Sequence, residues 1–230
     1  MKRFWREAAV SEGESGFGIK LDGRRLKTPA RNALIVPTRA LVEAVASEWR
    51  DCGEEIDPRA MPLTGLANAA IDRIADDPED FAAGLARYGE SDLTCYRAEG
   101  PEPLVRRQAE SWDVLLDWAR RRYDVDFACA TGIMHVAQPG DTIAKLAHAV
   151  AILDPFRLSG LSPLVTIGGS LVAGLAVLEE AIPADSAWEA VSLDERWQAE
   201  QWGADAEATA ALDGKRADFI AAARFLSLLD

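Results

Sequence analysis

Three residues near the end of the chain have types and spacing suited to recognition of another molecule. Glu195, Gln198 and Trp202 recur every three to four positions, so on a helix they share one face with Trp188 and Val191. A carboxylate and an amide then interrupt a stripe that is otherwise fit for burial. Helix geometry alone favours a structural hydrogen bond or ion pair for Glu195, because buried polar groups are nearly always satisfied. The alternative is a contact with a partner molecule.

Capping signals predict the helix that would carry this face. Ser186-x-x-Glu189 forms a capping box, in which the serine hydroxyl accepts from the backbone N–H of Glu189 and the glutamate reaches back. Gly203 stands where helices often end in a left-handed residue. We therefore expect one helix over residues 187–202.

Residues that could support catalysis are present but do not form a recognisable site. Asp194, Glu195 and Glu200 would supply an acid and a base, yet nothing specifies a substrate pocket. The chain's two histidines belong neither to a metal-ligand cluster nor to a Ser or Cys triad. Gly168-Gly169-Ser170 lacks the lysine of a phosphate-binding loop. We therefore predict no enzymatic activity, no catalytic residues, no metal site and no cofactor.

The charge distribution argues against nucleic acid and anionic membranes as the main partners. The formal net charge is −13, although residues 1–50 hold ten Lys and Arg against six Asp and Glu. An acidic protein is repelled by phosphates and by anionic headgroups. The run Arg120-Arg121-Arg122 is typical of a solvated helix end that complements the helix dipole. We therefore predict no nucleic-acid binding.

Cysteine usage and the first residues indicate the compartment. Cys52, Cys95 and Cys129 are an odd number at wide spacing, which is typical of buried, reduced thiols and not of a disulfide framework or a zinc site. The first residues lack the apolar core of a secretion signal. The sequence therefore predicts a cytoplasmic protein.

The first third of the chain has the pattern of short strands followed by helices. Residues 17–21 alternate apolar and polar side chains, Asp22-Gly23 is a strong hairpin signal, and further strands follow up to Val36. Apolar residues at helical spacing then predict helices over residues 38–52 and 63–74. This combination indicates a small antiparallel sheet with helices packed on it.

Beyond a boundary placed after residue 76, the pattern is helical throughout, except that residues 125–138 are predicted to be extended. We therefore expect an α+β fold. A small N-terminal antiparallel β-sheet with helices would occupy residues 1–76, and a larger all-helical domain would occupy residues 77–230.

The longest uncharged stretch, residues 158–178, is long enough to span a membrane. Its proline, glycines and hydroxyl side chains lower the mean hydropathy, and flanking aromatic residues are absent. The pattern therefore favours a central helix over about residues 155–180, surrounded by other helices, and no membrane insertion.

Six blocks of sequence stand out together, in order along the chain. They are Leu21-Asp22-Gly23-Arg24-Arg25-Leu26-Lys27-Thr28-Pro29, Glu48-Trp49, Met61-Pro62-Leu63-Thr64, Asp92-Leu93-x-Cys95-Tyr96-Arg97-Ala98, Arg107-Gln108-x-x-x-Trp112-Asp113, and Glu195-x-x-Gln198-x-x-x-Trp202-Gly203 with Glu207-Ala208. Together they resemble the assembly chaperones for the alpha subunit of the F-type ATP synthase. The resemblance extends over nearly the whole chain, from Phe4-Trp5 to the last helix.

This resemblance implies an ATP-independent chaperone in the cytoplasm, or in the mitochondrial matrix in eukaryotic relatives. It would bind the free alpha subunit at the nucleotide-binding domain and prevent its aggregation until the beta subunit replaces it. The residues that would contact this partner lie in the last block and in the basic hairpin; they are Glu195, Gln198, Trp202, Arg24, Arg25 and Lys27. For the hairpin, a contact with the partner or with an acidic group of the same chain is favoured equally with a solvated strand edge, where cations discourage strand-to-strand association.

An alternative function is a small-molecule-binding or hydrolytic enzyme whose site lies between the two domains, where pockets commonly form. The missing nucleophile–base pair favours the chaperone.

Overall fold

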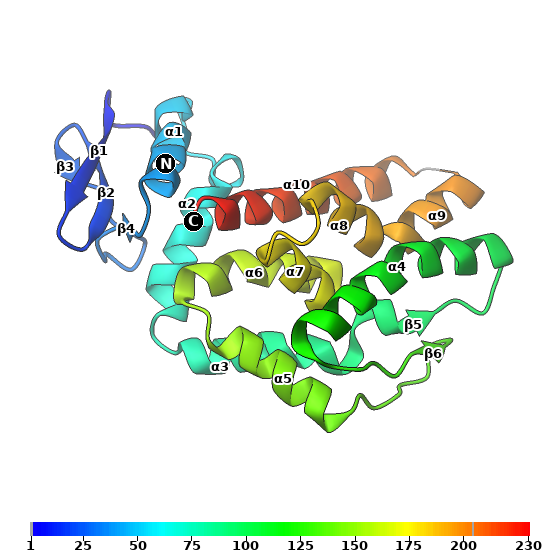
Figure 1. Ribbon diagram of the computed structural model, residues 1–230. Helices are drawn as coiled ribbons and strands as arrows, with labels where there is room; N and C mark the ends of the chain where they lie inside the picture. The colour runs from blue at the N-terminus through cyan, green and yellow to red at the C-terminus, as the bar shows by residue number, and fades with distance from the viewer. Residues whose placement is uncertain (1, 204) are drawn as a thin grey trace. The chain divides into compact units, whose positions relative to one another are not determined.

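The computed structural model in Figure 1 describes residues 2–203 and 205–230. The chain forms two compact units. The first contains the chain up to Pro78 with Asp154–Gly160 and Arg224–Asp230, and the second contains Glu79–Leu153 and Leu161–Ala223. The division of the chain into two domains, residues 1–76 and 77–230, stays a prediction.

The first unit contains an antiparallel sheet centred on one hairpin. Its strands are β1 (Ala8–Gly13), β2 (Gly16–Leu21), β3 (Arg24–Arg25) and β4 (Ile35–Val36), and β2 pairs with the other three. The turn between β2 and β3 has φ of 47° at Asp22 and 80° at Gly23. Two successive residues with positive φ match the right-handed twist of a hairpin, which is why Asp-Gly is preferred there. The predicted hairpin is confirmed.

Helix α1 (Arg39–Asp51) packs its apolar face on this sheet. Thr38 caps it by accepting from the Leu41 N–H at 3.2 Å, and the buried side chains include Leu41, Val42 and Val45. Helix α2 (Pro62–Ala69) follows a short 3₁₀ turn (Pro58–Ala60) and continues into a π-helical segment (Ala70–Ile74). Both helices agree with the periodicity of the sequence.

Glu48 connects α1 to the start of α2. Its carboxylate accepts from the backbone N–H groups of Leu63 and Thr64, both at 2.8 Å, and from the Thr64 hydroxyl at 2.6 Å. An acid at a helix N-terminus satisfies N–H groups that lack intrahelical partners and complements the helix dipole. Two of the six sequence blocks therefore meet in one helix cap.

Asp72, in the π-helical segment, holds the loop that follows β3. Its carboxylate accepts from the Thr28 hydroxyl at 2.6 Å, the Ala30 N–H at 2.9 Å and the Asn32 amide at 2.9 Å. Desolvation raises the pKa of Asp72, but these three hydrogen bonds outweigh it, so the net pKa lies below its ordinary value of 3.8. The charged form is therefore the form that stabilises the fold.

We expect Asp72→Asn to lower the free energy of unfolding by about 1 kcal/mol at pH 7, because the amide accepts fewer of these bonds. A lowered folded pKa gives stability that is present above the unfolded pKa and is lost as pH falls through the folded pKa. The difference between wild type and variant should therefore shrink as pH falls below 3.8. Urea unfolding at pH 7 and at about pH 3 measures it, with the exposed Asp76→Asn as the control. A difference that stays constant with pH would contradict this role.

Helices make up most of the rest of the chain, and they confirm the α+β fold class. They are α3 (Pro78–Ala86), α4 (Glu102–Tyr123), α5 (Gly140–Ala151), α6 (Pro155–Gly168), α7 (Leu171–Leu178), α8 (Ala184–Val191), α9 (Leu193–Trp202) and α10 (Ala206–Ser227). Two 3₁₀ segments (Arg87–Ser91 and Leu93–Cys95) precede β5 (Tyr96–Arg97), which pairs in parallel with β6 (Ala130–Thr131). Strand β6 lies in the segment predicted to be extended, but the pairing of β5 with β6 was not expected, so the description of residues 77–230 as all-helical is wrong at this pair.

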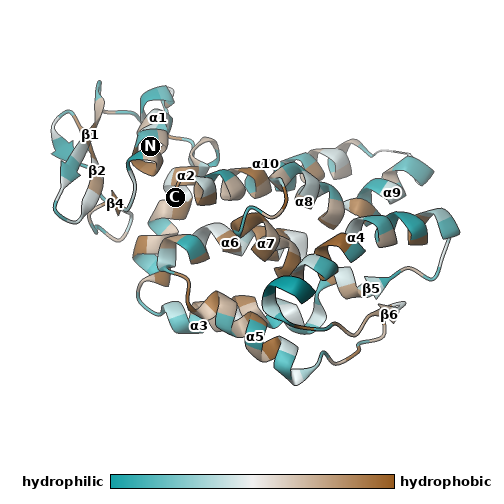
Figure 2. Cartoon of the chain, in the orientation of Figure 1, coloured by the Kyte–Doolittle hydropathy of each residue, from teal (hydrophilic) through white to brown (hydrophobic). Residues whose placement is uncertain are grey.

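Helix α7 is the buried core of the second unit. Every residue of Leu171–Val177 is buried, and Figure 2 shows α7 in the brown of apolar residues. A side chain at Gly174 would lie 2.8 Å from Cγ2 of Val165, so only glycine allows this close approach of α6 and α7. Among the described residues, no helix is both long and apolar enough to cross a bilayer.

Two of the predicted helices are broken, and each prediction of a single helix is wrong. The predicted helix over residues 155–180 ends at Gly168, because Gly169 adopts φ of 65° and Ser170 caps α7. The predicted helix over residues 187–202 is divided at Ser192 and begins earlier, at Ala184 after Pro183. The capping box at Ser186 is therefore not formed.

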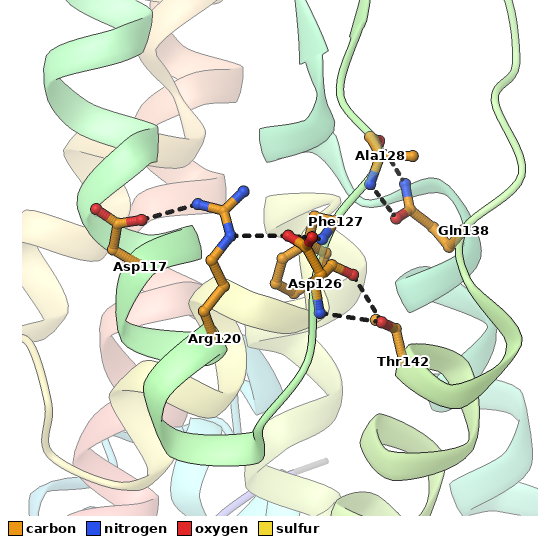
Figure 3. Close-up of polar contacts among 7 residues, drawn as sticks. All are labelled: Asp117, Arg120, Asp126, Phe127, Ala128, Gln138 and Thr142. Atoms are coloured by element: carbon orange, nitrogen blue, oxygen red, sulfur yellow. Dashed lines mark hydrogen bonds and ion pairs between the residues drawn. The ribbon is translucent and has the colours of Figure 1, made fainter.

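The segment between α4 and α5 is extended, as predicted, and is held by side chains along its length (Figure 3). Arg120 binds Asp117 at 2.8 Å and Asp126 at 3.2 Å, and the Thr142 hydroxyl donates to the Asp126 carbonyl at 2.6 Å. Gln138 pairs with both backbone groups of Ala128, at 2.8 and 3.0 Å. The pKa of Asp126 is lowered most by the hydrogen bond from the Phe127 N–H, and next by the hydrogen bond from the Arg120 side chain. These contacts order a segment that has little regular structure.

Candidate functional site

Helix α9 is attached to α4 through its inner face. Trp197 is buried there, and the Arg107 guanidinium lies 4.8 Å from the centre of its ring. Arg107 also binds the Glu200 carboxylate at 2.7 Å, and the Gln108 amide donates to Asp194 at 2.8 Å. These contacts hold α9 against α4 and determine which of its faces remains open.

Other residues of the sequence blocks support this attachment. Gln108 is buried, and its amide oxygen accepts from the Ala98 N–H at 2.8 Å. Trp112 is fully buried, and its indole N–H donates to the Ala190 carbonyl of α8 at 2.8 Å. The Arg97 guanidinium lies 5.3 Å from the centre of the Trp112 ring. Two of the blocks thus form a scaffold for α8 and α9.

The outer face of α9 carries Glu195, Gln198 and Trp202, and all three are exposed. Trp202 is 80% exposed. Trp188 and Val191, which the spacing places on the same face, are buried and do not share this exposure. They lie on α8, and the break at Ser192 separates α8 from α9. The prediction of a stripe fit for burial is therefore wrong for α9.

Glu195 has no structural partner within residues 2–203 and 205–230, since no hydrogen bond or ion pair joins it to another side chain or to the backbone there. The neighbouring acids differ, because Asp194 binds Gln108 and Glu200 binds Arg107. The structural hydrogen bond or ion pair that helix geometry favours for Glu195 is therefore not formed.

The exposed residues of α9 line a groove of about 830 Å³ together with the first turns of α10. Its lining is mainly apolar and includes Trp202, Ala199, Ala208, Ala211 and Leu212. Charged groups are also among the residues that line it; they are Glu195, Arg196, Glu200, Asp205 and Lys215. A largely apolar groove with a few charges can bind an apolar surface and orient it.

The α10 residues of this groove were missed by sequence reasoning. Residues 205–218 of the described chain are exposed, apart from the half-buried Leu212. The available signal was Leu212 itself, a single large apolar residue in a stretch rich in alanine and charge. Its position opposite α9 depends on how the chain reverses after Gly203, which has φ of 90°.

The basic hairpin lies in the first unit, and the groove lies in the second. Arg24, Arg25 and Lys27 are exposed, and no salt bridge within residues 2–203 and 205–230 involves them. Backbone N–H groups of Glu7 and Arg6 bind the Asp22 carboxylate at the turn, at 2.9 and 3.1 Å, and lower its pKa. The structure brings together Glu195, Gln198 and Trp202 in the second unit, and the three cations belong to the first.

A comparison with protein families decides what kind of protein this is. The family described as ATP12 chaperone protein matches residues 2–120, which is more than half of the chain. The chain belongs to this family.

Individual relatives agree with that assignment over most or all of the chain. Protein atp12, mitochondrial, from Schizosaccharomyces pombe is 23% identical over 214 residues, which cover 88% of this chain and 74% of that protein. The crystal structure of Atp12 from Paracoccus denitrificans has a TM-score of 0.94 and 43% identity, covering 100% of this chain and 98% of that one. The Atu1473 protein of Agrobacterium tumefaciens has a TM-score of 0.95 and 38% identity, covering 100% and 86%.

The family assignment identifies the protein as a chaperone and not an enzyme.

The most buried acid of the second unit has a structural role. Asp92 is 0% exposed and accepts from the N–H groups of Thr94 and Val172 and from the Thr94 and Ser170 hydroxyls, at 2.7–3.0 Å. Burial raises the pKa of Asp92, and these hydrogen bonds oppose that rise. Asp92 thereby caps the Leu93–Cys95 segment and α7 at once.

Proposed function

We propose that this chaperone acts in assembly of the F-type ATP synthase by binding the free alpha subunit at its nucleotide-binding domain. It prevents aggregation of the alpha subunit in the cytoplasm until the beta subunit replaces it. Membership of the ATP12 chaperone family supports the class of function, and the order of the six sequence blocks supports the client.

The groove between α9 and α10 is the observation that carries the proposal. A subunit of an obligate ring exposes a large apolar interface before assembly, and such a surface self-associates. The groove presents Trp202 at 80% exposure next to a carboxylate, Glu195, that is not used by the fold. An exposed aromatic side chain supplies affinity, and a single charge determines register.

The chaperone needs no ATP of its own. The sequence contains no phosphate-binding loop, since Gly168-Gly169-Ser170 lacks the lysine. Covering an interface reversibly requires only an equilibrium that favours the beta subunit as the final partner. The basic hairpin is proposed as a second contact, through Arg24, Arg25 and Lys27, with an acidic part of the client.

Co-expression with the isolated alpha subunit tests the proposal. We expect the alpha subunit to stay soluble with this chain, and to aggregate without it. The purified proteins should give the same protection from aggregation with and without ATP, measured by light scattering. An alpha subunit that aggregates equally in both cases would reject the client, and protection that requires ATP hydrolysis would reject the mechanism.

Glu195→Gln should leave the free energy of unfolding within about 0.5 kcal/mol of wild type, because the side chain is exposed and makes no bond within the fold. Protection of the alpha subunit should nevertheless weaken, and Glu195→Lys should weaken it further. The measurements are thermal unfolding and client solubility side by side. The exposed Glu207→Gln, which does not line the groove, is the matched control. If melting and protection are both unchanged, Glu195 is not part of the site.

A further inference from the structure

Two cysteines lie opposite each other at the start of β5 and β6, the adjacent strands of Figure 1. The strands pair in parallel, with Tyr96 opposite Ala130. Cys95 and Cys129 immediately precede this pair. Neighbouring strands lie about 4.8 Å apart, and opposite residues place their side chains on the same face. Disulfides join Cα atoms about 4.4–6.8 Å apart, so the register holds the two cysteines within disulfide range.

The two thiols also interact, and their environments differ. Cys95 is 1% exposed, as predicted for a buried thiol, whereas Cys129 is exposed, so that prediction is wrong for Cys129. Burial raises the pKa of the Cys95 thiol, and the charge of Asp92 and the neighbouring Cys129 thiol raise it further. Cys129 is therefore the thiol that a small solute reaches first.

The backbone around the pair is ordered on both sides. Beyond β6, the Gly132 N–H donates to the Arg97 carbonyl at 2.8 Å, and Ala128 is held by its two bonds to Gln138 (Figure 3). The two cysteines are thus kept facing each other by contacts outside the pair. A bond between the two sulfurs is compatible with this strand pairing, because the register places the two cysteines on adjacent backbone segments.

We propose that Cys95 and Cys129 form a dithiol site that a hydroperoxide oxidises to an intramolecular disulfide. In the first step, the Cys129 thiolate attacks one oxygen of hydrogen peroxide. An S–O bond forms, the O–O bond breaks, and the departing hydroxide takes up a proton, leaving a sulfenic acid and water. In the second step, Cys95 gives up its proton and attacks the Cys129 sulfur. The S–S bond forms, the S–O bond breaks, and a second water leaves, so that two thiols and one peroxide yield one disulfide and two waters.

The disulfide would attach the extended segment of residues 124–139 to the 3₁₀ turn Leu93–Cys95, which Asp92 caps. That segment presents Ile133 and Met134, which are 97% and 76% exposed. In a reducing compartment such a bond is transient, which is typical of redox-sensing thiols. The oxidised protein resists unfolding of this segment until the bond is reduced.

The test is oxidation of the purified protein with a small excess of hydrogen peroxide, followed by thiol counting in denaturant and peptide mapping. Of the three free cysteines, we expect two to be lost, with one cross-linked peptide pair that contains Cys95 and Cys129. Dithiothreitol should restore both thiols. The melting temperature should rise by about 5 °C or more on oxidation and return on reduction.

Two variants separate this site from general oxidation. Cys129→Ser changes an exposed residue and should abolish both the cross-link and the rise in melting temperature. Cys52→Ala removes the remaining thiol and should leave both unchanged. The proposal is overturned if Cys95 stays reduced while Cys129 ends as a sulfinic or sulfonic acid, or if the only disulfide formed joins two chains.

Discussion

Replacement of Asp92 by alanine is expected to lower the free energy of unfolding by about 3–5 kcal/mol. The reason is that four hydrogen-bond donors would lose the Asp92 carboxylate as their acceptor. Two of these donors are the backbone N–H groups of Thr94 and Val172, at the starts of two helical segments. The site is fully buried, so water does not replace the carboxylate. Urea unfolding and the melting temperature measure the loss, which should amount to about 10 °C.

Two further variants locate the cause of this loss. Asp92→Asn keeps the shape and one acceptor oxygen, and it should lose about half as much stability as the alanine variant. Asp213→Ala removes an exposed carboxylate of α10 and should change stability by less than about 0.5 kcal/mol. If Asp92→Ala melts like Asp213→Ala, the carboxylate does not hold the starts of α7 and the preceding turn.

Trp202→Ala is expected to raise the Kd for the isolated alpha subunit by about 30-fold or more, equivalent to about 2 kcal/mol. A tryptophan that is 80% exposed in the free protein contributes little to folding, so the melting temperature should not change. The apolar area of its ring becomes available to a partner that enters the groove with Leu212 and Ala208. Calorimetry or surface binding with purified alpha subunit measures the change.

Ile133→Ala provides the control for this experiment, because Ile133 is 97% exposed and lies outside the groove. It should leave the Kd unchanged. If it weakens binding as much as Trp202→Ala, the client is held by scattered apolar contacts and the groove is not the site. If neither variant changes the Kd, the client binds elsewhere on the chaperone.

Structure determined by neighbouring residues could be read from the sequence. The Asp22-Gly23 turn requires positive φ at two adjacent positions, and that requirement is visible in the residue types themselves. The buried face of α1 follows from apolar residues at helical spacing. The six blocks could be recognised as a set, and the family assignment agrees with them.

Features that depend on distant residues were decided only by the tertiary structure. The start of α7 is stabilised by Asp92, which lies far back in the sequence, so periodicity alone predicted one helix through Gly169. The break at Ser192 turns Glu195 and Trp202 outward although their spacing places them with Trp188.

Contacts between residues that are distant in sequence were likewise decided by the tertiary structure. Cys95 and Cys129 are widely spaced in sequence, and the wide spacing indicated buried, reduced thiols and no disulfide framework, but the parallel register of β5 and β6 places them side by side. Leu212 joins the groove only because α10 reverses beside α9. Residue types and spacing therefore determined the local elements, the fold class and the family of this protein. Helix breaks, exposure of the candidate site and contacts between distant residues were decided by the tertiary structure, because their hydrogen-bond partners and packing neighbours come from remote segments of the chain.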